Sequence, residues 1–275
     1  MKIWEALIYG LVAGLTGLLP VSFSGHAAVL QDAFALSPLT QGGGLYIRAA
    51  ITLGLSAALV LAFPGELQLT CGELARRPQR GKRARQPSPR RRAVLMGLLA
   101  LPIGLLSLIW CAAAERITRL SLIAAFFCLN GLILFAAGRP GGQKDARALM
   151  LPDALLACAT RLAAVLPGLS PLGLTLAVCR LRDLRTDFAL RFTAMLTLGF
   201  SLCEFVYRLL RAVIVGTFSA SLWLPMLVAL VASTVAGYFA LQYLKYLLHR
   251  EKLRVFSYYC WDAAVIALIL ALINA

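Results

Sequence analysis

Two apolar stretches of this chain, 6–36 and 152–180, are each interrupted near the middle by proline and glycine. The first contains Leu-Leu-Pro-Val-Ser-Phe-Ser-Gly at 18–25, and the second contains Val-Leu-Pro-Gly-Leu-Ser-Pro-Leu-Gly at 165–173. Each half is shorter than the ~20 apolar residues that a helix needs to cross a bilayer. Interrupted backbone at membrane depth is tolerated only where it is buried in protein or lines a wet cavity. The sequence therefore predicts two re-entrant helical hairpins.

A second pair of similar segments follows the hairpins in the same order. Segment 48–56 shares with segment 191–201 an Arg, a Thr, a Gly and a Ser, which are Arg48, Thr52, Gly54 and Ser56 in the first and Arg191, Thr197, Gly199 and Ser201 in the second. Broken segments at corresponding places in two halves are typical of inverted-repeat membrane proteins and point to a central binding site. We therefore expect one integral membrane domain over 1–275, with repeat 1 at about 1–138 and repeat 2 at about 150–275.

Composition places the chain in a membrane. Hydrophobic residues make up 60% and charged residues 14%, against roughly 45–50% and 25% in soluble domains. Apolar runs long enough to span a bilayer lie at 46–63, 93–112, 119–138, 186–206, 222–245 and 256–274. The run at 186–206 is the weakest, because it carries Arg191 and Glu204. The predicted fold class is an all-α polytopic membrane protein with about six transmembrane helices and two re-entrant hairpins.

The formal charge of +15 first suggests nucleic acid, but its placement argues against that partner. Nine Lys and Arg residues lie within 76–92 with no acid among them, in a segment that joins two spans. Basic loops of this kind are typical of the cytoplasmic side, so we interpret 64–92 as a basic cytoplasmic loop. Counting spans from it places both termini outside and makes the hairpins enter from opposite faces. Arg208 and Arg211 then fall, as exceptions, in an outer loop at 207–221.

The first hairpin carries candidate chemistry just after its bend. Pro20 ends the first half-helix, and Ser22 or Ser24 can cap the second by accepting from free backbone N–H groups. A helix start at membrane depth offers such donors to a phosphate, and Gly25 allows close approach. His26 can act there as a nucleophile or as an acid–base catalyst. The alternative is that His26 hydrogen-bonds a neighbouring helix and the serines only cap.

The second hairpin is built alike but has no histidine. Gly168 and Gly173 permit close approach of the backbone. Ser170 can cap the following helix, with Pro171 at its first position. These positions are candidate contacts to a substrate.

Arg161 lies upstream in the same apolar stretch. It can bind a phosphate bidentately, or it can pair with an internal acid such as Asp153 or Glu204. Arg48 and Arg191, at corresponding positions in the two repeats, either mark membrane boundaries or contribute to a ligand site. The seven cysteines are scattered singly without metal or redox spacing, so no metal site is predicted from them.

The hairpins resemble those of the undecaprenyl-pyrophosphate phosphatases, also known as bacitracin-resistance proteins. That family's motifs read roughly Glu-Gly-x-x-Glu-x-x-Pro-x-Ser-Ser-x-Gly-His and Pro-Gly-x-Ser-Arg-Ser-Gly. The likeness extends to Ile-Thr-Leu-Gly at 51–54, Asp-Ala-Leu at 153–155 and Phe-Ser-Tyr-Tyr at 256–259, and so covers nearly the whole chain. It implies the same inverted-repeat fold, a polyprenyl phosphate or pyrophosphate lipid as substrate, and a role in cell-envelope synthesis at the bacterial inner membrane.

The departures from the family pattern concern its charged residues. The two motif glutamates fall on Ala13 and Gly17, and the motif arginine falls on Pro171. The second serine of each motif falls on Phe23 and Leu172. The family's Mg²⁺ or Ca²⁺ would need carboxylate ligands, which are missing here. The cofactor and the roles of Glu204 and Asp32 are open.

Three hypotheses follow. The first is a divergent phosphatase, in which His26 acts on the phosphoryl group, Ser22, Ser24 and Ser170 donate hydrogen bonds, and Arg161 supplies charge beside Gly25, Gly168 and Gly173. The second is a protein on the same fold that binds or flips a lipid phosphate without hydrolysis. The third is a scaffold with relic hairpins, against which ionisable groups at membrane depth count. A homodimer is one assembly that the sequence allows.

Overall fold

The computed structural model describes residues 2–65, 72, 88–139 and 142–274. These residues form eleven α-helices and one 3-10 helix, without a strand among them. The elements of the first half are α1 (Ile3–Gly17), α2 (Phe23–Phe34), α3 (Gly44–Ala62), α5 (Pro89–Leu105), α6 (Ser107–Ala114) and α7 (Leu120–Ala137). Those of the second half are α8 (Leu151–Ala164), α9 (Pro171–Leu181), α10 (Thr186–Val215), η1 (Ala220–Leu222), α11 (Trp223–His249) and α12 (Val255–Ile273). The predicted all-α class is confirmed.

Both predicted hairpins are present. α1 and α2 contain 15 and 12 residues, and α8 and α9 contain 14 and 11. At 1.5 Å per residue none of them exceeds about 23 Å, whereas the hydrocarbon core of a bilayer is about 30 Å thick. Each helix therefore ends inside the membrane, and the chain turns back at 18–22 and at 165–170.

The spans match the predicted segments closely. α3, α7, α11 and α12 are long and apolar enough to cross a membrane, and α5 with α6 forms a fifth, bent by 40°. α10 is not among these, although its 30 residues are long enough; it carries charged side chains along its length. It runs to Val215, so the predicted outer loop at 207–221 is wrong in its first nine positions. Arg208 and Arg211 are helical residues, and both pair with Glu115.

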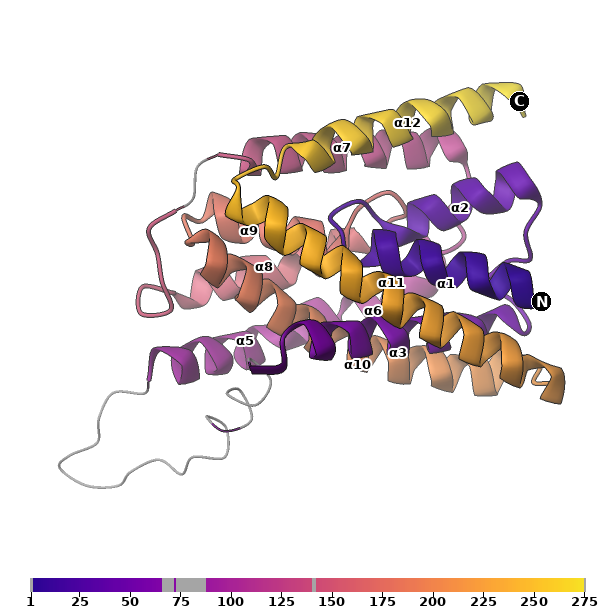
Figure 1. The fold of residues 1–275 in the computed structure, drawn as a ribbon, viewed down its shortest axis with the longest axis horizontal. Helices are drawn as coiled ribbons and strands as arrows, with labels where there is room; N and C mark the ends of the chain where they lie inside the picture. The colour runs from indigo at the N-terminus through magenta and orange to yellow at the C-terminus, as the bar shows by residue number, and fades with distance from the viewer. Residues whose placement is uncertain (1, 66–71, 73–87, 140–141, 275) are drawn as a thin grey trace.

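The long helices pack through small residues. Figure 1 shows α7 beside α12, and α11 crossing over α1 and α3. A Cβ on Gly14 would lie 2.7 Å from the backbone nitrogen of Gly237, and a Cβ on Gly10 would lie 2.8 Å from the carbonyl oxygen of Ala229. Because lipid tails are as apolar as the side chains, no hydrophobic force drives helices together in a bilayer, and they associate through close van der Waals contacts of this kind. α1 is thereby held tightly on α11.

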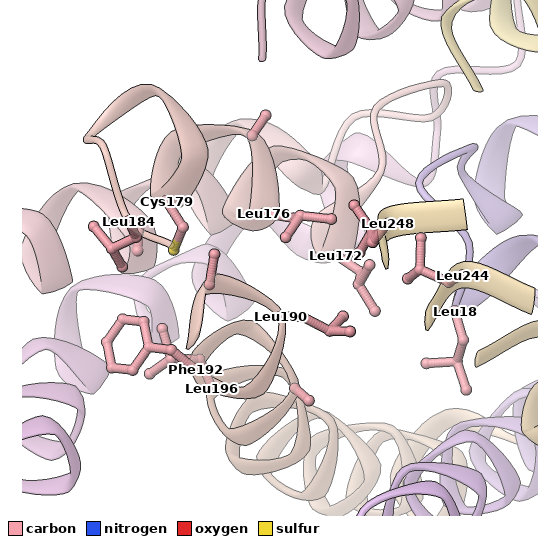
Figure 2. Packing of buried hydrophobic residues seen from close by; sticks show 14 of the residues in the cluster. Leu18, Leu172, Leu176, Cys179, Leu184, Leu190, Phe192, Leu196, Leu244 and Leu248 are labelled. Atoms are coloured by element: carbon pink, nitrogen blue, oxygen red, sulfur yellow. The ribbon is translucent and has the colours of Figure 1, made fainter. Parts of the chain in front are cut away.

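The main buried cluster lies between the second hairpin and α11. Leu172, Leu244 and Leu248 belong to it (Figure 2), and all three are almost fully buried. Leu18, at the bend of the first hairpin, belongs to the same cluster and is 1% exposed. The two bends are therefore anchored in one core.

The two repeat-bearing helices, α3 and α10, pack on each other. Ser56 and Ser201, which correspond in the two repeats, lie with their Oγ atoms 2.9 Å apart. Two residues related by a two-fold axis can contact each other only if both lie close to that axis. Ser56 and Ser201 therefore lie near the axis that relates the two halves. The exact boundaries of the repeats stay a prediction.

Most of the predicted basic loop at 64–92 lies outside the described residues. Its last part is helical: Ser88 caps α5 by accepting from the backbone N–H of Arg91 at 3.2 Å. Pro89 occupies the first helical position, where a missing N–H costs nothing. Arg90, Arg91 and Arg92 therefore lie in the first turn of α5 and not in the loop.

Candidate functional site

The two hairpin bends are joined by the serines that cap their second helices. Ser22 Oγ accepts from the N–H of Gly25 in its own hairpin at 3.4 Å and from the N–H of Gly168 in the other at 3.1 Å. Ser170 Oγ accepts from the N–H of Gly173 at 3.1 Å and donates to the carbonyl of Leu19 at 3.3 Å. The predicted caps are confirmed, with Ser22 as the cap of α2. Both serines are fully buried, so neither hydroxyl is available to a ligand.

Ser22 has a backbone conformation that few residues other than glycine adopt. Its φ is 71°, a region that costs of order 1 kcal/mol or more for a residue with a Cβ. The bonds made by its hydroxyl offset this cost. The strain is stored at the point where the two bends meet.

Asn130 of α7 bridges the two bends from the side. Its Nδ2 donates to the carbonyl of Pro20 at 2.9 Å, and its Oδ1 accepts from the N–H of Ser170 at 3.0 Å. These backbone groups have no helical partner because each lies at a break, and an unpaired buried group costs about 1–3 kcal/mol. Asn130 is itself fully buried. It therefore acts as a clamp on both hairpins.

The glycines at the bends are required by close approach. A Cβ on Gly25 would lie 2.9 Å from Gly168 Cα, and a Cβ on Gly173 would lie 2.9 Å from Pro20 Cα. Gly168 has φ of 106° and faces the carbonyl of Ile123. The predicted glycines thus shape the contact between hairpins.

His26 has hydrogen-bond partners on both ring nitrogens. Nδ1 lies 2.7 Å from the carbonyl oxygen of Ser22, which can only accept, so Nδ1 carries the proton. Nε2 lies 2.9 Å from the hydroxyl of Tyr259 and, in this tautomer, accepts from it. The ring stacks on Tyr259 with centroids 5.6 Å apart and meets the edge of Phe127. This is the hydrogen-bonded arrangement that the sequence left as the alternative to catalysis.

A central pocket of about 130 Å³ lies on the other side of the hairpin bends. α2, α3, α6, α8, α9 and α10 all contribute to its wall. Arg161 of α8 lines it and is 7% exposed, and its guanidinium lies over the ring of Phe200 at 4.6 Å. Nε and Nη2 of Arg161 are buried without a hydrogen-bond partner. A guanidinium left in this state is costly at membrane depth.

The remaining charges of the pocket form a closed network. Arg208 donates to Glu204 through Nε at 2.9 Å and to Glu115 through Nη1 at 2.8 Å. Arg48 lies 3.2 Å from Glu115, which Arg211 also contacts. Three arginines and two glutamates line the pocket, so its lining has one positive charge in excess, and Arg211 adds a further positive charge to the network. Among the lining arginines, Arg161 has two nitrogens without a hydrogen-bond partner.

The structure groups the predicted site residues in three places. Ser24 and Arg161 line the central pocket. Ser22, Gly25, Gly168, Ser170 and Gly173 form the contact between the bends. His26 does not line the pocket and lies against α7 and α12. The predicted partner Asp153 is bound instead by Arg182 at 2.7 Å, and Glu204 by Arg208.

Sequence reasoning missed several contributors. Glu115 lies between the predicted spans 93–112 and 119–138, and Arg208 lies in the predicted outer loop 207–221, although both line the pocket. Asn130 is the polar residue at the centre of an apolar run, and a buried polar residue there is a usable signal for an interhelical contact. Tyr259 was noted only as part of a family motif. Its role depends on α12 lying beside α2, which no local pattern reveals.

The donor set of the pocket does not fit a divalent cation. Among the described residues no three His, Cys, Asp or Glu side chains stand close enough together to hold one. Glu115 and Glu204 both accept from arginines, whereas Mg²⁺ and Ca²⁺ need oxygen ligands that face the ion. The lining instead has one positive charge in excess.

Fold and site together define an all-α, multi-pass membrane protein whose two broken hairpins meet beside a cationic pocket. The family model described as "Bacitracin resistance protein BacA" matches residues 6–266. The chain belongs to this family, as the motif resemblance predicted.

Curated relatives cover almost the whole chain. A protein of Methanobrevibacter smithii named undecaprenyl-diphosphatase is 30% identical over 97% of this chain and 96% of its own length. One of Carboxydothermus hydrogenoformans with the same name is 31% identical over 98% of each chain. One of Rubrobacter xylanophilus, also so named, is 29% identical over 99% of this chain and all of its own.

Proposed function

We propose that this protein acts on a polyprenyl diphosphate carrier lipid and removes its terminal phosphate, with Arg161 holding that phosphate in the central pocket. The observation that carries the proposal is the buried guanidinium of Arg161, two of whose nitrogens lack a partner beside an open pocket. A phosphate oxygen supplies the acceptors that these nitrogens lack. The names of the relatives support the same substrate class.

Arg161 takes the place of the family's motif arginine. The motif position falls on Pro171, and Pro171 lines the same pocket as Arg161. The positive charge is thus supplied from α8 instead of from the start of α9. Because α8 and α9 both line the pocket, an arginine on α8 can supply the positive charge that the family motif places at the start of α9.

The reaction needs charge stabilisation above all. Water attacks the terminal phosphorus, the bond from phosphorus to the bridging oxygen breaks, and inorganic phosphate and a polyprenyl monophosphate leave, with one proton released to solvent. Charge spreads over the oxygens of the transferred group, where Arg161 and the hydroxyl of Ser24 donate to it. His26 holds the start of α2 through Ser22 and Tyr259, and is a positioning residue.

The finer assignments belong to the same proposal. The basic ends of α5, α10 and α11 face the cytoplasm under the positive-inside bias, which puts both termini outside and the charged network of the pocket nearer the outer face. The membrane is the inner membrane of a bacterium, and the chain's role is recycling of the carrier lipid. A homodimer stays a prediction.

A second function is binding or translocation of the lipid phosphate without hydrolysis. It is favoured by the state of the pocket acids: Glu115 and Glu204 are each held by arginines, and the motif glutamates are Ala13 and Gly17. No carboxylate in the pocket is then positioned to take a proton from water. In both functions Arg161 binds the lipid phosphate, but only in the first is the diphosphate hydrolysed.

The test is phosphate release by the purified full-length protein from a long-chain polyprenyl diphosphate, with and without Mg²⁺ or Ca²⁺. We expect Arg161→Met to lower release about 100-fold or more, Arg161→Lys to lower it less, and the exposed control Arg250→Met to leave it unchanged. No release by the unaltered protein, with lipid binding that Arg161→Met abolishes, would establish the second function. If the unaltered protein neither releases phosphate nor binds the lipid, both proposed functions are excluded.

A further inference from the structure

A second polar cleft lies at the opposite end of α3 and α10 from the charged network of the central pocket. It encloses about 490 Å³ between the starts of α5 and α10 and the segment 145–147. Four arginines and two aspartates line it: Arg90, Arg147, Arg185, Arg191, Asp145 and Asp187. The cleft therefore has an excess of positive charge.

The two aspartates are engaged elsewhere. Asp145 Oδ1 accepts from the backbone N–H groups of Arg147 and Ala148 at 2.8 and 3.3 Å. Asp187 Oδ1 lies 3.3 Å from Nε2 of His249 at the end of α11. Each carboxylate closes a turn or joins two helices and keeps its negative charge, so the four arginines of the lining exceed the two aspartates by two positive charges.

An apolar groove continues from this cleft toward the middle of the membrane. It encloses about 190 Å³ between α3, α5 and α10, and shares Val94, Arg191 and Met195 with the cleft. Its wall is otherwise aliphatic or aromatic, with Gly97 and Gly199 leaving room between the helices. A cationic cleft that opens into an apolar groove is complementary to a lipid with an anionic headgroup and an acyl chain.

We propose that the cleft and groove together bind one anionic glycerophospholipid from the leaflet at the basic end of the protein. The phosphate would lie among the arginines and one acyl chain along the groove. From Arg90 to Leu101, α5 rises about 17 Å, close to the ~15 Å thickness of one hydrocarbon leaflet. An acyl chain fills that length, whereas a long polyprenyl tail exceeds it.

The repeat gives this site a structural reason. Arg191 in the cleft corresponds to Arg48 in the central pocket. In an inverted repeat, a cationic site near one face has a counterpart near the other. The cleft around Arg191 has no hairpin bends beside it. It therefore combines positive charge with an apolar groove and has no closed pocket like the one around Arg161. The phospholipid site does not depend on the proposed phosphatase activity.

The experiment is native mass spectrometry of the full-length protein with dioleoyl phosphatidylglycerol as the probe and dioleoyl phosphatidylcholine as the neutral comparison. We expect the double variant Arg147→Gln with Arg185→Gln to weaken phosphatidylglycerol binding about tenfold or more, at about 1 kcal/mol for each basic residue lost. Arg250→Gln with Lys252→Gln removes the same charge at the same end of the protein, outside the cleft, and serves as the matched control.

A second variant tests the groove. A Cβ on Gly199 would meet only Leu101 Cδ1, at 3.3 Å, so Gly199→Leu fills the groove by displacing the end of one flexible side chain. We expect it to weaken binding several-fold, whereas Val206→Leu, on the exposed face of the same helix, leaves binding unchanged. A thermal melt of each variant confirms that it is folded.

Four results would overturn the proposal. If phosphatidylcholine bound as tightly as phosphatidylglycerol, charge would not determine binding. If the control pair weakened binding as much as the cleft pair, the lipid would not bind in the cleft. Displacement of phosphatidylglycerol by inorganic phosphate alone would show an anion site without a lipid. If a polyprenyl monophosphate displaced the phospholipid at equal concentration, the occupant would be the carrier lipid instead.

Discussion

The two hairpins have the same backbone plan but carry their ionisable groups in opposite states. Each bend ends in a buried serine that caps its own second helix and contacts the other hairpin. In the first hairpin, His26 has both nitrogens hydrogen-bonded and faces other helices. In the second, Arg161 faces a pocket with two nitrogens unpaired.

The difference shows that hairpins with the same backbone plan can hold their ionisable side chains in different environments. A buried polar group without hydrogen-bond partners needs an explanation, such as a ligand, whereas a group whose hydrogen bonds are made does not. In the proposed function, His26 therefore positions the start of α2, and Arg161, which the family motif does not contain, binds the phosphate.

The largest effect on the frame should come from the glycines where the bends touch. Gly173→Ala puts a Cβ 2.9 Å from Pro20 Cα, where backbone must move. We expect a loss of about 3 kcal/mol, measured by the thermal unfolding midpoint in detergent. Gly17→Ala is the control, because its Cβ would come closest to the flexible end of the Leu55 side chain, at 3.1 Å, and would meet Phe23 Cβ only at an ordinary 3.7 Å. Equal destabilisation by both would show that the bends are not in tight contact.

The next effect should come from the clamp at Asn130. Asn130→Leu keeps the volume but leaves the carbonyl of Pro20 and the N–H of Ser170 without partners, so we expect a loss of about 2 kcal/mol. Asn274→Leu removes an exposed amide that bonds Asp32 and should be nearly neutral. A small effect of Asn130→Leu in the same melt would mean that one hairpin holds its position without the other.

A smaller effect should come from the hydroxyl that binds His26. Tyr259→Phe keeps the stacked ring and removes one hydrogen bond, so we expect a loss of about 1 kcal/mol. Its neighbour Tyr258 is similarly exposed, at 53% against 45% for Tyr259, but it is Tyr259 that bonds His26, so Tyr258→Phe should change nothing. If Tyr259→Phe left stability unchanged but abolished phosphate release, His26 would belong to the chemistry and the contrast between the hairpins would fail.

The smallest effect should appear at the far end of the second hairpin. Although burial raises the pKa of Glu251, hydrogen bonds from Arg180 and Thr186 hold that pKa below its usual value. A lowered pKa gives stability that is present above pH ~4.5 and is lost as pH falls through the folded value. The side chain is 43% exposed, so solvent screening limits the effect to below about 1 kcal/mol.

The measurement is the unfolding midpoint of the unaltered protein and of Glu251→Gln between pH 7 and pH 3. The difference between the two proteins should shrink as the pH falls below ~4.5. A difference that is constant across this range would mean that the carboxylate does not anchor α9 through its charge.

The sequence by itself determined the fold class, the hairpins and their caps. Chain breaks, apolar run lengths and capping serines are local features, and local physics fixes their consequences: a helix ends at Gly17, shortly before Pro20, and another starts after Ser170. The same reading placed Glu115 and Arg208 in outer loops, because a charge near the end of an apolar run looks local until its partner is known.

Only the tertiary structure decided which of these residues share a site. Glu115 follows α6, Arg161 lies on α8 and Arg208 lies on α10, and the Glu115–Arg208 ion pair spans 93 positions of the sequence. The state of His26 depends on Tyr259, which is 233 positions away. The free energy of a buried charge is set by what surrounds it in space, so a motif can name a residue without revealing whether its hydrogen bonds are already complete.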